Sequence, residues 1–415
     1  MATEIVFPLA AEANKQAFLP FSAPWFGDEE KNEILQTLAS DWITTGPRTK
    51  TFEAKFSDYI GSGEAVAVNS CTAALHLALA AIGVSPRDAV ITSPLTFAAT
   101  ANVIVHQGAQ PIFIDIEPDT YNLDPQKLVT FVQQQCRWDP RNRALWTKKT
   151  NKRVRAIIPV HYAGHPCDMN RISECAREFR MTVIEDAAHA LGATYFGRKV
   201  GTLGDMACFS FYPTKNISTG EGGMLTTQDP ELARRVRLLS LHGISRDAWK
   251  RYGPDGSWRY DILDAGFKYN MTDLSAALGI HQLEKLPRFL KRRGELAKQY
   301  ENLLADLPLK RPTALANVES AWHLYPVQVQ SSWISREQLI ARLRADNIGT
   351  SVHFIPLHLM SYYQRRFGYQ MGDFPVAESV FNRIVSLPFF PRMTDSDIER
   401  VGFAMRKAFA ESMAA

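Results

Sequence analysis

The segment Thr182-Val183-Ile184-Glu185-Asp186-Ala187-Ala188-His189 places two acids and a histidine directly after a short, β-rich apolar run. Similar runs recur between about residues 60 and 230 and alternate with helix-like stretches; they lie at 65–68, 89–91, 111–114 and 155–160. Strands that alternate with helices predict an α/β domain around a mostly parallel central sheet flanked by helices. Ligands of such domains bind beyond the carboxyl ends of the strands, so the residues that follow each run are the candidates for a site.

A longer helical pattern begins near Thr272 and continues towards Leu303, far enough to leave a first domain and enter a second. The chain has 415 residues, and single hydrophobic cores stop growing near about 250–300 residues. We therefore expect a large α/β domain over residues 1–285 and a smaller C-terminal α+β domain over residues 286–415. Pro287 is expected to kink or interrupt the helix near this boundary.

The overall composition is that of an ordinary globular protein, with 46% hydrophobic and 22% charged residues. A formal net charge of +4 is too small to favour a nucleic-acid or membrane partner. No apolar run approaches the ~18 residues that span a bilayer, and the N-terminus lacks the order of a secretory signal. The five cysteines are odd in number and form no C-x-x-C pair, which favours a reducing compartment and a cytoplasmic location.

Two stretches have the character of insertions. Residues 137–153 contain seven lysines and arginines with two tryptophans and no obvious period, which predicts a solvated surface loop. Residues 243–260 interleave cations with aromatic residues, among them Trp249 and Arg251. Aromatic faces for a base and cations for a pyrophosphate suit a nucleotide, and a packed loop explains the same pattern.

A lysine stands in the aromatic segment Phe209-Ser210-Phe211-Tyr212-Pro213-Thr214-Lys215-Asn216, just before Gly220-Glu221-Gly222-Gly223. A lysine in such a loop is often a surface residue whose stem packs on apolar neighbours. A desolvated lysine, in contrast, has a lowered pKa and a free amine that can form a Schiff base with an aldehyde. The partners of Lys215 decide between these interpretations.

The first candidate partner is Asp186, which stands 29 positions before Lys215 and can reach the same ligand from a neighbouring strand. Pyridoxal chemistry needs a carboxylate beside the pyridine nitrogen, because the protonated ring is the electron sink for a carbanion. A helix-capping role explains Asp186 as well. His189 can face the phenolic oxygen of such a ring, although a single histidine on a helix is more often structural.

The second candidate is the start of a helix in Val68-Asn69-Ser70-Cys71-Thr72. Free backbone N–H groups and the helix dipole make such a start a phosphate site, and Ser70 and Thr72 add hydroxyl donors. A well-capped helix gives the same pattern. Ser210 can reach the same phosphate, and Phe97 can stack on one face of a cofactor ring, with small Ala188 leaving room on the other.

With these motifs the chain resembles the sugar-nucleotide aminotransferases, the DegT-like branch of the fold-type I pyridoxal-phosphate (PLP) enzymes. The resemblance runs from Trp42-Ile43-Thr44-Thr45-Gly46-Pro47 to Ser386-Leu387-Pro388-Phe389-Phe390-Pro391. It also includes Val160-His161-Tyr162-Ala163-Gly164, Gly266-Phe267-Lys268-Tyr269-Asn270-Met271-Thr272-Asp273 and Val352-His353-Phe354-Ile355-Pro356-Leu357-His358.

The resemblance implies that PLP is the cofactor and that Lys215 holds it as a Schiff base. It further implies that Asp186 pairs with the pyridine nitrogen, that His189 contacts the phenolic oxygen and that Phe97 stacks on the ring. The residues implied to surround the phosphate are Ser70, Cys71, Thr72 and Ser210. In the family the site lies at the interface of a homodimer, and Asn270 corresponds to a residue that reaches the neighbouring subunit's phosphate.

Dehydratase relatives carry histidine at the position of Lys215, so the lysine favours amino transfer. The resemblance implies transfer from an amino-acid donor, L-glutamate, to a nucleotide-linked keto-sugar. The 243–260 segment resembles members that act at C4, which favours a 4-keto sugar. A 3-keto sugar or a keto-cyclitol remains an alternative acceptor, and a non-catalytic regulator with the same fold is the alternative of another class.

The predicted small domain, which closes over the substrate in the family, contains His323, His353 and His358. We expect His353 and His358 to contact the sugar, together with Trp249 and Arg251. None of these three histidines forms an H-x-x-x-H pair with another, the cysteines form no C-x-x-C pair, and Schiff-base chemistry needs no metal, so we expect no metal site.

Overall fold

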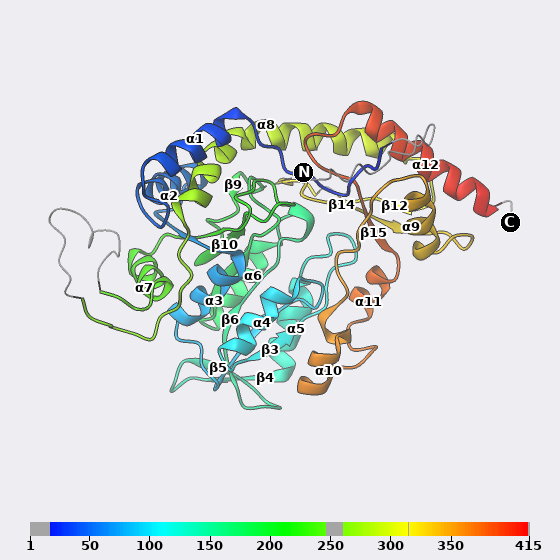
Figure 1. The fold of residues 1–415 in the computed structure, drawn as a ribbon. Helices are drawn as coiled ribbons and strands as arrows, with labels where there is room; N and C mark the ends of the chain where they lie inside the picture. Colours follow the sequence, from blue (N-terminus) through cyan, green and yellow to red (C-terminus); the bar gives the residue numbers. More distant parts are fainter. Residues whose placement is uncertain (1–16, 246–259, 314, 414–415) are drawn as a thin grey trace, which may run out of the picture.

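The computed structural model describes residues 17–245, 260–313 and 315–413. A large α/β part and a smaller C-terminal part lie side by side, and helix α8 (Asp273–Leu303) runs along one side of both (Figure 1). Trp249 and Arg251 fall outside the described residues. No helix within the described ranges is both long and apolar enough to cross a membrane.

The central sheet of the large part has the strand order β1-β11-β10-β7-β6-β2-β3. Strand β11 is antiparallel to both of its neighbours, and the pairs from β10 to β3 are all parallel. The predicted mostly parallel α/β fold is thereby confirmed. The strands are β1 (Glu64–Val68), β11 (Gly223–Thr227), β10 (Met206–Ser210), β7 (Thr182–Asp186), β6 (Arg153–Ile157), β2 (Asp88–Thr92) and β3 (Gln110–Phe113).

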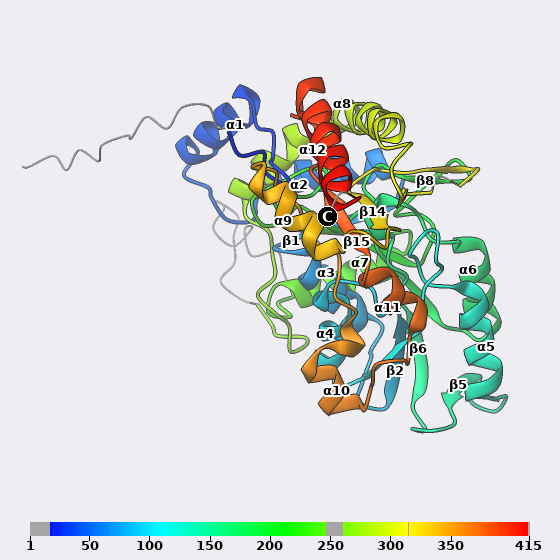
Figure 2. The same cartoon turned by 90° about the vertical axis from the view of Figure 1, so that its right-hand side faces the viewer.

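Each strand of this sheet divides its side chains between two cores, because successive residues of a strand point to opposite faces. In β7, Val183 joins the core that includes α2 (Pro47–Ile60), α5 (Pro125–Gln135) and α6 (Met169–Glu178). Its neighbour Ile184 joins the core that includes α3 (Cys71–Ala81), α4 (Ala98–His106) and α7 (Pro230–Ser240). Figure 2 shows α5 and α6 on one side of β2 and β6, with α3 and α4 on the other. Both faces are therefore covered, as near-continuous apolar strands require.

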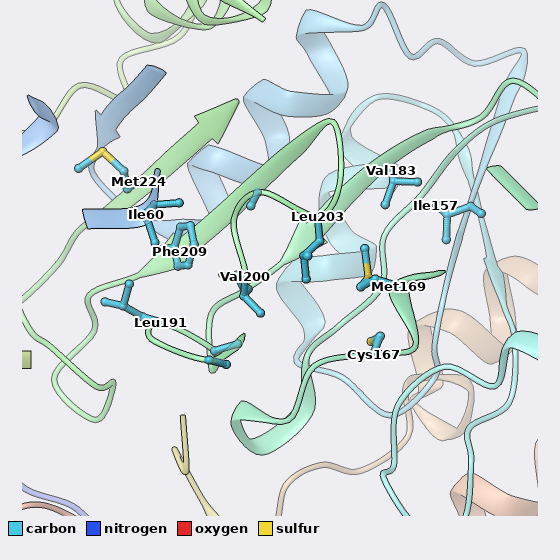
Figure 3. Close-up of a cluster of buried hydrophobic side chains, with 14 of the residues drawn as sticks. Ile60, Ile157, Cys167, Met169, Val183, Leu191, Val200, Leu203, Phe209 and Met224 are labelled. Atoms are coloured by element: carbon cyan, nitrogen blue, oxygen red, sulfur yellow. The ribbon is translucent and has the colours of Figure 1, made fainter. Parts of the chain in front are cut away.

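The first of these cores is built mainly from strand residues and the loops that follow them. Figure 3 shows Ile157, Val183, Phe209 and Met224 of four strands, with Leu203 and other loop residues near them. Phe209 is completely buried, and its ring packs edge-on against Phe56 with a centroid distance of 5.1 Å. Because β10 ends at Ser210, this packing also holds in place the start of the loop that carries Lys215.

Residues 137–153 do not form the predicted solvated loop. They belong largely to a hairpin of β4 (Cys136–Asp139) and β5 (Ala144–Thr147), and Trp146 of β5 pairs with Arg153 of β6. Ala144 and Leu145 are buried, with Leu145 part of the first core. The many basic residues of this segment favoured the prediction of a loop, whereas the few buried apolar residues determine that it forms a hairpin.

The C-terminal part is an α+β arrangement, as predicted. Its sheet has the order β12-β14-β15, with both pairs antiparallel, and α9 (Arg336–Ala345) and α12 (Asp395–Met413) pack beside it. The strands are β12 (Leu309–Lys310), β14 (Tyr325–Val329) and β15 (Ile384–Leu387).

The remaining α-helices and strands, taken from both parts of the chain, are α1 (Asp28–Ala39), α10 (Ser361–Phe367), α11 (Pro375–Phe381), β8 (Thr194–Tyr195), β9 (Arg198–Lys199) and β13 (Val318–Glu319).

Helix α8 supplies side chains to the first core of the large part and to the core of the C-terminal part. Leu286 and Phe289 belong to the first core of the large part, whereas Leu296 and Tyr300 belong to the core of the C-terminal part. Leu19, near the start of the described chain, also packs into the C-terminal core. The division between residues 285 and 286 stays a prediction, since one continuous helix spans it.

Of the kink or interruption expected at Pro287, the interruption does not occur, because α8 continues through this residue to Leu303. A proline inside a helix removes one backbone hydrogen bond. The flanking Leu283, Leu286 and Phe289 are all buried, so packing on both sides of the proline compensates for the lost bond. Tertiary contacts therefore override the local preference.

Candidate active site

A cavity of about 530 Å³ opens at the carboxyl edge of the central sheet. This volume is in the range of ordinary small-molecule sites. The large part contributes every residue predicted to hold the cofactor except Asn270; these are Ser70, Cys71, Thr72, Phe97, Asp186, His189, Ser210 and Lys215. The C-terminal part adds His323, Ser351, His353 and Phe354 to the lining, and Phe21 of the N-terminal segment also lines the cavity.

Lys215 lies in a tight loop between β10 and β11. Its backbone N–H donates to the carbonyl of Tyr212 at 2.8 Å, and the N–H of Thr219 closes the loop onto the carbonyl of Phe211 at 2.9 Å. Burial lowers the pKa of the Lys215 ammonium to about 8, although Cys71 and Asp186 act in the opposite direction. A substantial fraction of the amine is therefore neutral near pH 8, as a nucleophilic lysine requires.

The two acids at the end of β7 have different surroundings because adjacent residues of a strand point to opposite faces. Glu185 points away from the cavity and accepts hydrogen bonds from the backbone N–H groups of Gly201, Leu203 and Gly204 at 2.8–3.2 Å. His161 Nε2 lies 3.0 Å from the same carboxylate. Glu185 is thus a structural anchor, and only Asp186 lines the cavity.

Thr100 and Ala188 orient the carboxylate of Asp186. The Thr100 hydroxyl donates to Oδ2 at 2.7 Å, and the N–H of Ala188 donates to Oδ1 at 3.2 Å. Burial raises the pKa of Asp186, while these two hydrogen bonds and Lys215 lower it. A buried carboxylate in this position gains most from a cationic N–H partner. The sequence analysis assigned no role to Thr100. Its hydroxyl also lies 2.7 Å from that of Thr96, and the spacing of these two threonines, four residues apart, is the only signal in the sequence that could have indicated it.

His189 lies in the same cavity as a neutral ring. Burial is the main reason that its pKa falls well below the usual value, and Lys215 adds to the effect. The backbone N–H of Ala163 donates to Nδ1 at 3.3 Å, so Nδ1 is the acceptor nitrogen. The neutral ring then carries its proton on Nε2, which makes Nε2–H a hydrogen-bond donor.

The residues predicted to surround a phosphate at the start of α3, Ser70, Cys71 and Thr72, all line the cavity. The side chain of Ser70 caps helix α3 by accepting a hydrogen bond from the N–H of Ala73 at 3.1 Å, and Ser70 also lines the cavity. The capping role and a position at the cavity are therefore both observed. Gly223 crosses directly behind this turn, where an added Cβ would lie 2.5 Å from the backbone of Ser70 and 2.6 Å from that of Cys71. Burial raises the pKa of the Cys71 thiol well above its usual value, which leaves it a neutral wall residue.

Two of the predicted residues lie elsewhere in the single chain. His358 is buried away from the cavity lining, where Nε2 lies 2.8 Å from the Glu378 carboxylate, so the structure does not bring it to the proposed sugar position. Asn270 also lies outside the lining and forms hydrogen bonds with Thr45 and Lys268, both at 2.6 Å.

The cavity contains residues that the predictions assigned no role, chiefly His323, Phe354 and Phe21. They come from segments far from the cofactor motifs in the sequence, so only the tertiary fold brings them there. His353 does line the cavity, and burial lowers its pKa to about 4. It is therefore available as a neutral contact for a polar ligand.

These residues fit pyridoxal phosphate as a set. A neutral amine, an oriented carboxylate and an open helix start surround one cavity, and each matches one functional group of the cofactor: aldehyde, pyridine nitrogen and phosphate. Phe97 and Ala188 in the same wall leave an apolar slot for a ring.

Comparison with known proteins agrees with this geometry. Residues 24–406 match the model of the DegT/DnrJ/EryC1/StrS aminotransferase family. The chain belongs to this family. Among curated relatives, SpsC of Bacillus subtilis, a spore coat polysaccharide biosynthesis protein, is 48% identical over 393 residues, which cover 94% of this chain and 96% of SpsC. The uncharacterized protein MJ1066 of Methanocaldococcus jannaschii is 51% identical over 401 residues, 96% of this chain and 99% of MJ1066.

Among solved structures, Spr1654 of Streptococcus pneumoniae, described as a sugar aminotransferase, superposes in its PMP form with a TM-score of 0.85 and 33% identity, covering 95% of this chain and 99% of that one. Its PLP form gives a TM-score of 0.84. Membership of the family confirms the predictions of a PLP-dependent sugar aminotransferase and of its cofactor.

The lowered pKa of Lys215 predicts its reactivity in the cofactor-free protein. A neutral acylating reagent attacks only the unprotonated amine, so modification of Lys215 should rise through a midpoint near pH 8. Lys31 is the internal control, because Asp28 raises its pKa and its modification should begin at higher pH. Peptide mass spectrometry measures both sites in one sample, and equal midpoints would contradict the assignment.

Proposed function

We propose that this aminotransferase transfers the amino group of L-glutamate to a nucleotide-linked 4-keto sugar. The observation that carries the proposal is the buried Lys215 amine, with its pKa of about 8, in one cavity with Asp186 and the start of α3. The nucleotide is supported by the aromatic and basic segment 243–260. The residues that flank this segment lie next to β1: Leu241 pairs with Lys268, and Asn270 pairs with Val68 at the end of β1.

Bound PLP supplies the electron sink that makes the substrate carbon acidic. Lys215 Nζ is placed to act as the base that takes a proton from this carbon and returns one when the sugar is aminated. A pKa near 8 suits both directions, since the amine is partly neutral and partly protonated in the ordinary working range.

Asp186 would hold a proton on the pyridine nitrogen of bound PLP, and Thr100 orients its carboxylate. His189 would donate Nε2–H to the phenolic oxygen, because its Nδ1 already accepts from Ala163. Ser70, Thr72 and Ser210 would hold the phosphate together with the first N–H groups of α3. His353 would contact the sugar.

We also propose a homodimer with shared sites. Phe97 and Tyr212 line the cavity and are still 64% and 48% exposed, so one chain leaves part of the wall open. Exposed Leu35, Leu38 and Ile43 add further apolar surface that a second copy can cover. Asn270 is then available to the neighbouring subunit's phosphate rather than to its own.

Lys215→Ala should abolish turnover, because it removes both the covalent attachment of the cofactor and the base beside the substrate carbon. Loss of catalytic groups of this kind lowers kcat by about four orders of magnitude or more. The variant should also lack the visible absorbance of the attached cofactor. A kcat near that of the unchanged enzyme would refute the role of Lys215.

A panel of acceptors tests the substrate assignment. With glutamate as donor, nucleotide-linked 4-keto sugars should give amino-sugar products, detected by mass spectrometry, with kcat/KM at least about tenfold above 3-keto sugars and keto-cyclitols. Glutamate alone should convert the bound PLP to PMP, which absorbance follows. Preference for a 3-keto sugar, for a cyclitol or for sugars without a nucleotide would overturn the assignment.

Mixing two inactive variants tests the shared site. If Asn270 serves the neighbouring subunit, a mixed dimer of Lys215→Ala and Asn270→Ala subunits contains one site with both residues intact. Random reassortment should then restore up to about one quarter of the native activity. A mixture that shows only the average of its two parents would place Asn270 in its own subunit's site.

A further inference from the structure

Two neutral histidine rings pack against each other in the wall of the cavity. The ring centroids of His189 and His323 are 4.3 Å apart at an interplanar angle of 41°, and both side chains are buried. One ring comes from the loop after β7 and the other from the segment before β14, so the contact joins the two parts of the chain. The chemistry proposed above uses His189 and leaves His323 without a role.

The side chain of His323 is held through one ring nitrogen. Its Nδ1 lies 3.3 Å from Oδ1 of Asn216, the residue next to Lys215. The amide NH₂ of Asn216 donates to the carbonyls of Leu191 and Ala321, both at 3.2 Å, and this fixes which end of the amide faces the ring. Asn216 Oδ1 is therefore the acceptor, Nδ1 of His323 carries the proton, and Nε2 keeps its lone pair.

The backbone of His323 is held as well. Its N–H donates to the carbonyl of Ala163 at 2.9 Å, and its carbonyl accepts from the Arg293 guanidinium at 3.0 Å. Ala163 is also the residue whose N–H donates to Nδ1 of His189. One residue, Ala163, thus connects the two histidines, through its N–H to the His189 ring and through its carbonyl to the His323 backbone.

The surroundings keep both rings uncharged. The titratable groups that face His323 are His189, Lys215, Arg293 and His353, all of them bases. Those that face His189 are Lys215, His353 and His323. Burial is the largest cause, and together with these neighbouring basic groups it holds the pKa of each ring well below its usual value. A protonated histidine is therefore excluded from this pair at neutral pH.

We propose that His323 is a positioning residue that acts through His189. Locked by Asn216 and by its backbone, it fixes the face of the His189 ring so that Nε2–H points at the phenolic oxygen of PLP. This inference rests on the proposed role of His189. It predicts that His323 controls the ionisation of the bound cofactor without contacting it.

The physical consequence is a shift in a measurable pH midpoint. A hydrogen bond donated to the phenolic oxygen favours its ionised form, which lowers the pH at which the bound cofactor loses its proton. Loss of this bond should raise the midpoint by about one pH unit, the effect of one hydrogen bond to a charged group. An absorbance titration of the holoenzyme reads this midpoint directly, independent of turnover.

The test compares His189→Phe, His323→Ala, His323→Gln and the double variant His189→Phe/His323→Ala. Each single variant should raise the midpoint by about one pH unit, and the double variant should match His189→Phe, because His323 has no path to the cofactor once His189 is gone. His165→Gln is the matched control, since His165 is also buried but lies outside the cavity lining, and its midpoint should stay unchanged.

The outcomes separate this inference from the proposed function. An unchanged midpoint in His189→Phe would remove the role of His189 itself. A shift in His189→Phe with none in the His323 variants, or a double variant whose shift is the sum of the two, would overturn only the positioning role. If neither His323 variant folds and takes up PLP, His323 is a determinant of the fold, and the inference is also wrong.

Discussion

The structure depends on keeping one amine and one carboxylate out of water in the same cavity. Burying either group alone as an ion is costly. Lys215 responds with a pKa lowered to about 8, and Asp186 is stabilised by the hydrogen bonds from Thr100 and Ala188. The carboxyl edge of a parallel sheet suits this arrangement, because β7 ends in Asp186 and the neighbouring strand β10 leads into the loop that carries Lys215. The chemistry therefore follows from the topology of the sheet.

Strand β7 shows how closely the fold and the site are linked. Its last two residues are both acids, and the alternation of side chains sends them to opposite faces. Glu185 ties the strand to the 201–204 loop and to His161, while Asp186 faces the cavity. A slip of one residue in the register of β7 would exchange these roles and leave an unpaired carboxylate in the core. The buried contacts of Glu185 therefore keep Asp186 directed into the cavity.

The sequence predicted the elements whose signals are local. The strand runs that end in Asp186 and Ser210, and the helix start at Ser70, needed only neighbouring residues to be recognised, and the structure places all three at the cavity. What could not be predicted depends on contacts between distant segments. His323 reaches the cavity only because β14 packs beside the large part. The residues next to His323 in the sequence show no pattern that predicts this position.

The same distinction explains the incorrect expectations. The buried Leu145 decides the conformation of the 136–147 hairpin, yet its single apolar signal is outnumbered by charges. Pro287 breaks isolated helices, but in α8 it stands among buried residues on both sides. In both cases the tertiary environment outweighs the composition or the local propensity.

Arg293 of α8 ties the 322–323 segment, which includes His323 of the cavity lining, to the core. Its buried guanidinium donates to the carbonyls of Trp322, His323 and Phe389. Burial lowers its pKa to about 9, which shows how unfavourable the charged form is there. Movement of the 322–323 segment away from α8 would break two of these three hydrogen bonds and leave only the one to Phe389, at a cost larger than that of an ordinary surface contact. Because His323 belongs to that segment, the core itself holds this part of the cavity wall in place.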